Sequence, residues 1–166
     1  MPSESEATDG SDGKDGAAVR FPPPFVPVIA LAIGIILERY VLPISPSLSS
    51  LIRFGVGGLL LVTGLGLMAA AFGLFRSTGQ DPKPWEVTPE IISTGIYGFT
   101  RNPMYVSMGL LQAGIGLALS NLWVVLLVPV TWITIYRLAI RYEEAYLERK
   151  FGSEYLDYKR AVRRWV

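Results

Sequence analysis

The hydrophobic positions of this chain gather in four long blocks instead of alternating with polar positions. The blocks cover roughly residues 24–42, 51–75, 103–119 and 122–142. An apolar helix of ~20 residues, rising ~1.5 Å per residue, crosses the ~30 Å hydrocarbon core of a bilayer. The pattern therefore predicts an all-α integral membrane protein with four transmembrane helices.

The second block is rich in small residues, most of them glycine. Small residues allow the backbones of neighbouring helices to approach closely in lipid. Gly64, Gly66, Ala70 and Gly73 are therefore predicted to lie against other helices.

The polar segments outside these blocks divide the chain. Residues 1–20 are acidic and polar and cannot bury enough apolar surface to order themselves, so they are predicted to form a disordered tail. A single membrane domain, residues 21–166, follows this tail. Residues 76–102 combine prolines, which break regular structure, with aromatic side chains that avoid water. This connection is either a flap at the membrane interface over a site or a loop anchored by an aromatic belt.

The fourth block gains charge towards its end without losing its helical pattern. Its helix is expected to leave the membrane and continue to Lys150, with a kink at Pro129. Gly152 is expected to end it, and residues 154–164 to form a short, basic, amphipathic helix.

The positions of lysine and arginine predict the orientation in the membrane. The two outer turns hold only Arg39 and Arg53, whereas basic residues are frequent around the connection 76–102 and in the C-terminal region. Cytoplasmic segments carry the excess of Lys and Arg. Both termini and the C-terminal amphipathic helix are therefore predicted to be cytoplasmic.

The amino-acid composition limits the kinds of partner and of reactive group that this protein can use. Hydrophobic residues make up 51% of the chain and charged residues 17%, against roughly a quarter charged in an ordinary soluble domain. The net charge of +1 gives no electrostatic argument for a nucleic-acid partner. The sequence contains no cysteine and no histidine, which excludes thiol nucleophiles and removes the commonest metal ligands and general base. We therefore expect no metal site.

Two clusters of reactive side chains flank the third and fourth blocks. Residues 95–105 bring a cation, an amide and two phenols next to a proline that suits the first turn of a helix. Glu143 and Glu144 follow the fourth block. Ser120 and Asn121 turn the chain between the two helices, and both clusters lie nearly equally far from this turn, within about 7 Å along the helix axis. The clusters are therefore predicted to meet at one end of a helical hairpin, at the cytoplasmic face.

The two glutamates point about 100° apart on a helix and should have different neighbours. Arg141 precedes Glu144 by one helical turn and is predicted to pair with it. Glu143 faces an apolar stripe and has no basic partner on its own helix. An acid placed so near a membrane is costly and indicates a functional site, although a solvated face on a protruding helix is the alternative for both residues.

At these residues the chain resembles the integral-membrane S-adenosylmethionine methyltransferases that include isoprenylcysteine carboxyl methyltransferase and the phospholipid methyltransferases. The similarity covers roughly residues 79–164. The motifs that carry it are Gly95-x-Tyr97, Arg101-Asn102-Pro103-Met104-Tyr105, Glu143-Glu144-x-x-Leu147 and Phe151-Gly152-Ser153-Glu154-Tyr155-Leu156-Asp157-Tyr158-Lys159. The family pattern reads Arg-His-Pro-x-Tyr, and here Asn102 replaces the histidine. An asparagine can hold a ligand by hydrogen bonds but cannot transfer a proton near pH 7.

The resemblance implies S-adenosylmethionine bound at the cytoplasmic membrane face and a lipophilic acceptor that enters from the bilayer. Arg101 and Glu143 are the implied catalytic residues. The implied cofactor-binding residues are Gly95, Tyr97, Arg101, Asn102, Pro103, Tyr105, Glu143 and Glu144. The acceptor that the resemblance implies is an isoprenylcysteine-type carboxylate or a phospholipid-like molecule, and the lack of histidine favours a carboxylate, which needs no base.

Two other functions are compatible with the sequence. NADPH-dependent membrane sterol reductases have similar C-terminal motifs, although those chains are much longer. A membrane scaffold without catalytic activity is the other alternative, and Asn102 in place of the histidine is its best support.

Overall fold

The computed structural model describes residues 17, 19, 21–45, 47–79 and 88–166. All regular elements of this described part are helices, and it contains no strand. It comprises α-helices, three short π-helical segments (η1, η2, η4) and one 3-10 turn (η3). In chain order these are α1 (Phe25–Ile36), η1 (Leu37–Val41), η2 (Leu51–Val56), α2 (Gly57–Ser77), η3 (Gly95–Gly98), α3 (Pro103–Ala118), α4 (Leu122–Leu126), α5 (Val128–Ile135), η4 (Tyr136–Ile140), α6 (Arg141–Phe151) and α7 (Ser153–Ala161).

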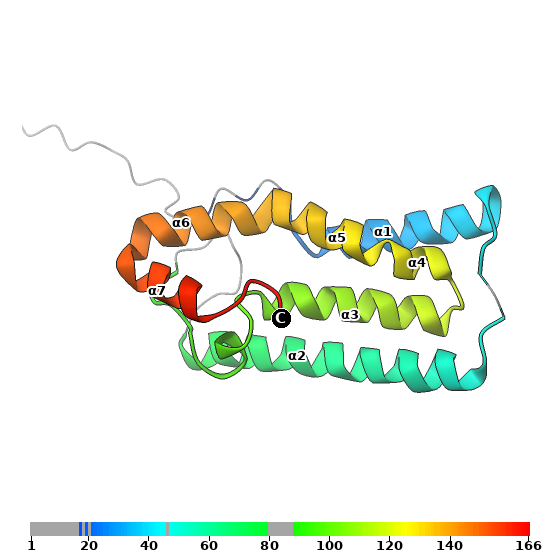
Figure 1. Cartoon of the computed structure of the whole chain (residues 1–166), viewed down its shortest axis with the longest axis horizontal. Coiled ribbons are helices and arrows are strands. Elements are labelled where there is room, and N and C mark those ends of the chain that lie inside the picture. The colour runs from blue at the N-terminus through cyan, green and yellow to red at the C-terminus, as the bar shows by residue number, and fades with distance from the viewer. Residues whose placement is uncertain (1–16, 18, 20, 46, 80–87) are drawn as a thin grey trace, which may run out of the picture.

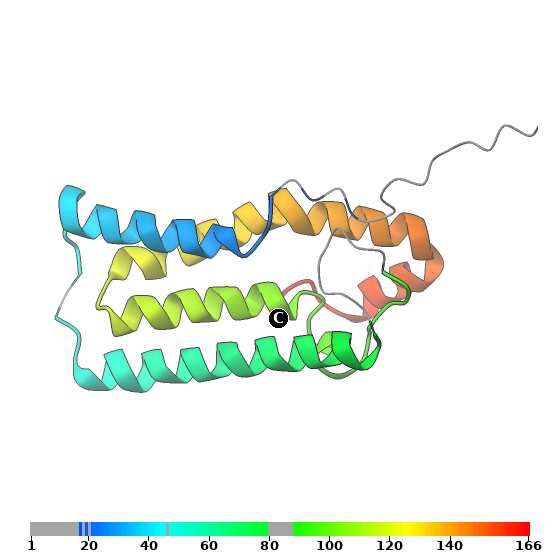
Figure 2. The ribbon, with the colours of Figure 1, turned by 180° about the vertical axis from the view of Figure 1, so that it is seen from behind.

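The long helices lie side by side in an elongated bundle (Figures 1 and 2). α2 and α3 form the most extensive helix pair, and α1 packs against α4 and α5. The connection from α1 to α2 lies at one end of the bundle, and α6 and α7 lie at the other (Figure 1). The bundle therefore has two distinct ends, and the start of α3 lies at the same end as α6, where Tyr105 of α3 is hydrogen-bonded to Glu143 of α6.

Glycines set the contact between α2 and α3. A Cβ atom on Gly114 would lie 2.8 Å from Leu61 Cγ and 2.9 Å from the Gly57 oxygen, and one on Gly64 would lie 2.9 Å from Leu111 Cγ. Such distances leave no room for a side chain. The predicted packing role is therefore right for Gly64.

The same role is wrong for the other three small residues of α2. A Cβ atom on Gly66 or Gly73 would meet nothing within 4 Å. Ala70 is exposed, whereas the next residue, Ala71, is completely buried. Composition alone did not fix which side of α2 faces α3.

The turn between α3 and α4 is held by side chains from other elements. Arg53 donates two hydrogen bonds, of 3.2 and 3.0 Å, to the Ala118 carbonyl at the end of α3. Asn121 Oδ1 accepts from the Val124 backbone N–H at 3.1 Å and caps α4, while its Nδ2 donates to the Gly34 carbonyl at 3.2 Å. These bonds satisfy backbone groups that a helix end leaves open. The tight antiparallel connection predicted from the sequence is present.

The fourth apolar block is interrupted at Leu127, two residues before Pro129. Proline removes one backbone donor and disturbs the preceding helical turn. Gln112 of α3 binds the chain on both sides of this interruption. Its Nε2 donates to the Val124 carbonyl at 3.0 Å, and its Oε1 accepts from the Thr131 hydroxyl at 2.8 Å.

The C-terminal part departs from the sequence prediction. Gly152 ends α6 with φ 54° and ψ −123°, a conformation that favours glycine, as expected. α7, however, ends at Ala161, because Val162 is extended (φ −120°, ψ 133°). The predicted helix over residues 154–164 is therefore too long at its C-terminal end. Residues 162–166, called the return segment below, leave the helix and run back towards the start of α3 (Figure 1).

Two helices are long and apolar enough to cross a membrane, Leu51–Ser77 and Leu122–Phe151. They suggest a membrane protein. α1 with η1 and α3 are shorter, so the count of four spans stays a prediction. Residues 1–16, 18, 20 and 80–87, which include most of the expected disordered tail and the middle of the predicted flap, lie outside the described residues.

We expect Gly114→Ala to destabilise the fold and Gly66→Ala to leave it unchanged or slightly more stable. The first Cβ would collide with α2, and overpacking of this kind costs about 1–3 kcal/mol. The second enters open space on a helix, where alanine is favoured over glycine by up to about 1 kcal/mol. Thermal melting of the purified proteins measures both. Equal melting temperatures for the two variants would contradict the assigned α2–α3 contact.

Candidate active site

A cavity of about 140 Å³ lies where the loop before α3, the beginning of α6 and α7 meet. Both predicted clusters contribute to it. Seven of the eight residues implied by the resemblance line this cavity: Tyr97, Arg101, Asn102, Pro103, Tyr105, Glu143 and Glu144. The eighth, Gly95, is not among the lining residues. Its φ of +58° favours glycine, and an added Cβ would lie 3.0 Å from Leu74 Cδ1, which indicates a role in the turn.

The backbone around Pro103 directs the first cluster inwards. Pro103 occupies the first turn of α3, where its missing N–H leaves no bond unmade. Asn102 precedes it in a non-helical conformation (φ −130°, ψ 53°), as the residue before a proline usually is. Thr100 Oγ1 accepts from the Asn102 backbone N–H at 3.2 Å and fixes this corner. The side chains of residues 101 and 102 are thereby held next to the N-terminus of α3.

Arg101 is a buried cation with spare hydrogen-bonding capacity. Its side chain is only 8% exposed, and its Nη1 lies 3.3 Å from Glu144 Oε1. Neither Nε nor Nη1 has a hydrogen-bond partner among the described residues. Buried N–H groups without partners are costly, more so on a charged group. The guanidinium is therefore suited to bind an anionic or carbonyl oxygen in the cavity that it lines.

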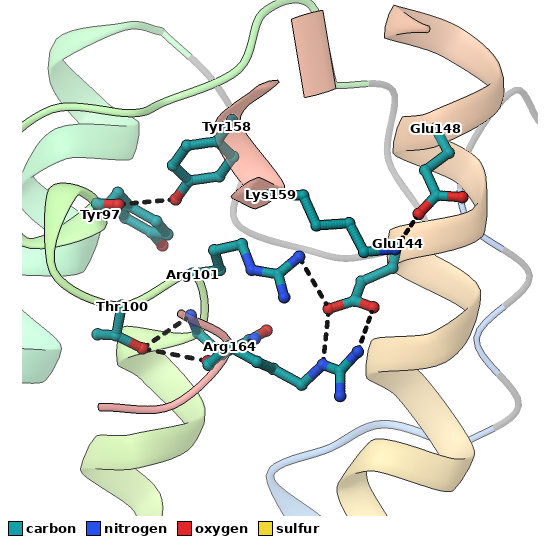
Figure 3. A network of polar contacts seen from close by, with 9 residues as sticks. Tyr97, Thr100, Arg101, Glu144, Glu148, Tyr158, Lys159 and Arg164 are labelled. Atoms are coloured by element: carbon teal, nitrogen blue, oxygen red, sulfur yellow. Dashed lines mark hydrogen bonds and ion pairs between the residues drawn. The ribbon is translucent and has the colours of Figure 1, made fainter. Parts of the chain in front are cut away.

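Glu144 is shared by two arginines. Arg164 donates from Nε to Oε1 at 2.8 Å and from Nη2 to Oε2 at 2.9 Å, a bidentate pair (Figure 3). These hydrogen bonds raise the pKa of the Arg164 guanidinium above its usual value. The predicted pairing of Glu144 with Arg141 is wrong, because Arg141 is exposed and donates to the Tyr142 hydroxyl at 2.6 Å. The three-residue cluster of two guanidiniums and one carboxylate keeps one net positive charge.

Glu143 has a different environment, as the angle between neighbouring helical residues requires. The Tyr105 hydroxyl donates to Glu143 Oε1 at 2.5 Å. Among the residues that the structure describes, no lysine or arginine pairs with Glu143, which agrees with the expectation that its own helix offers none. Glu143 therefore brings an acceptor group to the cavity that no described cation neutralises.

The return segment is part of the site, and sequence reasoning missed it. The Arg101 backbone N–H donates to the Arg163 carbonyl at 2.9 Å. The Thr100 hydroxyl donates to the Arg164 carbonyl at 3.2 Å (Figure 3). The Asn102 Nδ2 donates to the same carbonyl at 3.0 Å. Trp165 stacks on Trp132 of α5 with ring centres 5.7 Å apart. The signal available in the sequence was Arg163-Arg164-Trp165, which follows the observed end of α7.

Tyrosines form the aromatic side of the cavity. The Tyr158 hydroxyl donates to the Tyr97 carbonyl at 2.8 Å and joins α7 to η3. Burial raises the pKa of Tyr97 and of Tyr158 far above the usual range, and raises the pKa of Tyr155 to about 12. All three phenols therefore stay neutral at physiological pH and offer ring faces or hydroxyl donors, not charge. In the part of the chain that the structure describes, no group of three or more His, Cys, Asp or Glu residues could hold a metal ion.

Comparison with known proteins is consistent with this arrangement. A family profile described as phospholipid methyltransferase matches residues 52–154. The chain is 36% identical over 73 residues to protein-S-isoprenylcysteine O-methyltransferase of Saccharomyces cerevisiae, a match that covers 43% of this chain and 30% of the yeast protein. It is 43% identical over 63 residues to an uncharacterised protein of Haemophilus influenzae, covering 38% of this chain and the whole of that protein.

These matches do not favour a sterol-reductase-like function. The family profile covers more than half of the chain and includes both clusters that line the cavity. The chain belongs to the phospholipid methyltransferase family, a family of membrane methyltransferases.

Proposed function

We propose that this protein is an S-adenosylmethionine-dependent methyltransferase of the membrane that transfers a methyl group to a lipophilic acceptor. The observation that carries the proposal is the buried Arg101 guanidinium, which lines the cavity. Its Nε and Nη1 have no hydrogen-bond partner among the described residues, although Nη1 lies 3.3 Å from Glu144 Oε1. A carboxylate is the natural ligand for such a fork. The methyl donor carries one.

The other lining residues fit the remaining parts of the donor. Glu143, held by the Tyr105 hydroxyl, offers a carboxylate oxygen to the ammonium or to a ribose hydroxyl. The ring of Tyr97 offers an aromatic face to the adenine or to the sulfonium. Asn102 and Pro103 also line the cavity. Arg101 and Glu143 thus bind opposite charges of one molecule and set its orientation.

The donor supplies an electrophilic methyl group on a sulfonium. With the donor held by Arg101 and Glu143, transfer would be an in-line displacement, in which a lone pair of the acceptor would form the bond to carbon and the electron pair of the carbon–sulfur bond would stay on sulfur. The protein has to align the two reactants and exclude water. Arg101 and Glu143 do so by fixing the donor, and no protein group has to take a proton if the acceptor is a carboxylate.

We place residues 21–166 in the membrane as one domain with four spans, both termini and the cavity on the cytoplasmic side. The arrangement of the bundle supports this placement, since the α1–α2 connection and α7 lie at opposite ends (Figure 1). The acceptor then enters from the bilayer. A phospholipid or a prenylated cysteine carboxylate suits such a route, and the name of the yeast relative supports the second.

Arg101→Ala is expected to weaken binding of S-adenosylmethionine by about 1–3 kcal/mol, roughly five- to 150-fold, because the hydrogen bonds to a charged partner are lost. Isothermal titration of the purified protein measures the affinity. Arg141→Ala is the matched control, since it removes an equal charge from an exposed position on α6. Equal affinities for the two variants would refute the assignment of Arg101.

The acceptor group can be identified from the lability of the product. If it is a carboxylate, membranes incubated with methyl-tritiated donor should form a methyl ester, which alkali cleaves to volatile tritiated methanol. An N-methylated lipid would retain its label. We expect most of the label to be alkali-labile in membranes with the wild-type protein and to disappear with Arg101→Ala. Label that stays non-volatile after alkali would overturn the carboxylate assignment but not the methyltransferase activity.

The absence of cysteine from the sequence makes the topology directly testable. Ser47→Cys in the α1–α2 connection and Ser153→Cys at the start of α7 both place a thiol at an exposed position. In intact cells a membrane-impermeant maleimide should label the first variant, and it should label the second only after permeabilisation. The reverse pattern, or labelling of both from one side, would contradict the proposed orientation.

A further inference from the structure

Arg164 is not among the residues that line the cavity, yet it makes the closest contacts of the Glu144 carboxylate. Both carboxylate oxygens accept from Arg164, at 2.8 and 2.9 Å, whereas the Arg101 Nη1 lies 3.3 Å from one of them. Figure 3 shows the two guanidiniums on either side of this carboxylate. Glu144 is therefore bound mainly by the arginine outside the cavity.

The position of Arg164 is fixed by its own backbone. The carbonyls of Arg163 and Arg164 accept three hydrogen bonds from residues 100–102. Trp165, the next residue, stacks on Trp132, whose indole N–H donates to the Tyr105 carbonyl at 3.0 Å. The return segment is thus attached to the loop that carries Arg101 and, through Trp132 of α5, to the first turn of α3.

The attachment of Arg164 changes the net charge of the cluster formed with Arg101 and Glu144. Without Arg164, the carboxylate of Glu144 would face only the guanidinium of Arg101, and the pair would be neutral. Opposite charges attract strongly where water is largely excluded, and both side chains are about nine-tenths buried. With Arg164 bound to Glu144, the cluster retains one positive charge on the cavity side. That charge remains available to an anion.

We propose that Arg164 is a positioning residue for the methyl donor. It occupies the Glu144 carboxylate and thereby keeps the charge and the unpartnered N–H groups of Arg101 directed to the donor carboxylate. The inference rests on the proposed function. It also gives the return segment a specific task, because the segment delivers a countercharge to Glu144 that α6 itself does not supply.

Two probes separate this role from a general effect on structure. S-adenosylhomocysteine carries the carboxylate, and 5′-methylthioadenosine lacks both the carboxylate and the ammonium. Arg164→Gln, which keeps hydrogen-bonding groups but loses the charge, should raise the Kd of the first probe about tenfold and leave that of the second unchanged. Arg164→Lys, which keeps the charge, should stay within about threefold of the wild type for both probes.

A double variant tests the charge argument itself. If Arg164 acts by neutralising Glu144, then Glu144→Gln added to Arg164→Gln should restore most of the lost affinity for S-adenosylhomocysteine. Arg160→Gln is the control, because it removes a nearby charge from an exposed residue that pairs with Asp157 on α7. It should bind both probes as the wild type does.

Several results would overturn the inference. One is unchanged affinity of Arg164→Gln for S-adenosylhomocysteine, and another is a parallel loss of affinity for 5′-methylthioadenosine, which indicates a structural role. Failure of the double variant to bind better than the single variant would do the same. If the wild type binds neither probe, the proposed function fails and this inference fails with it. Wild-type binding combined with an unaffected Arg164→Gln removes only the role of Arg164.

Discussion

A buried carboxylate shared by two guanidiniums holds the site together. Glu144 belongs to α6, Arg101 to the loop before α3 and Arg164 to the return segment, so one acidic side chain joins three parts of the chain. Burying charge is costly unless the geometry is good and the partners are complete. Glu144 meets this condition through a bidentate pair. Arg101 does not, since two of its nitrogens are left without hydrogen-bond partners among the described residues.

The rest of the bundle serves to bring these three parts to one end. Close glycine contacts fix α2 against α3. The tight turn at Asn121 fixes α3 against α4, so these helices have little freedom to slide along one another. Arg53 closes the far end of α3 by binding its last carbonyl. A displacement of one helical turn between α3 and α6 would move Glu144 away from Arg101 by about 5 Å. Packing far from the cavity therefore determines the geometry inside it.

The sequence was sufficient where an argument depended on distance along a helix, and insufficient where it depended on contacts between distant segments. Pro103, the turn at Asn121 and Glu143 define the meeting of the clusters, because helical rise is nearly constant. The choice of Ala71 over Ala70 depends on how α2 is rotated against α3. Arg164 was assigned to a helix, and only the extended backbone at Val162 carries it to Glu144. Neither result follows from local pattern.

The same network gives Asn102 a structural role. Its amide donates to the Arg164 carbonyl and its backbone N–H donates to Thr100, so the residue helps to hold the return segment against the loop. An amide makes such bonds without titrating near neutral pH. The two adjacent glutamates have different roles. Glu144 pairs with the two arginines, while Glu143, bound by the Tyr105 hydroxyl, lines the cavity. The described side chains of this site therefore present both a positive and a negative group to the same cavity.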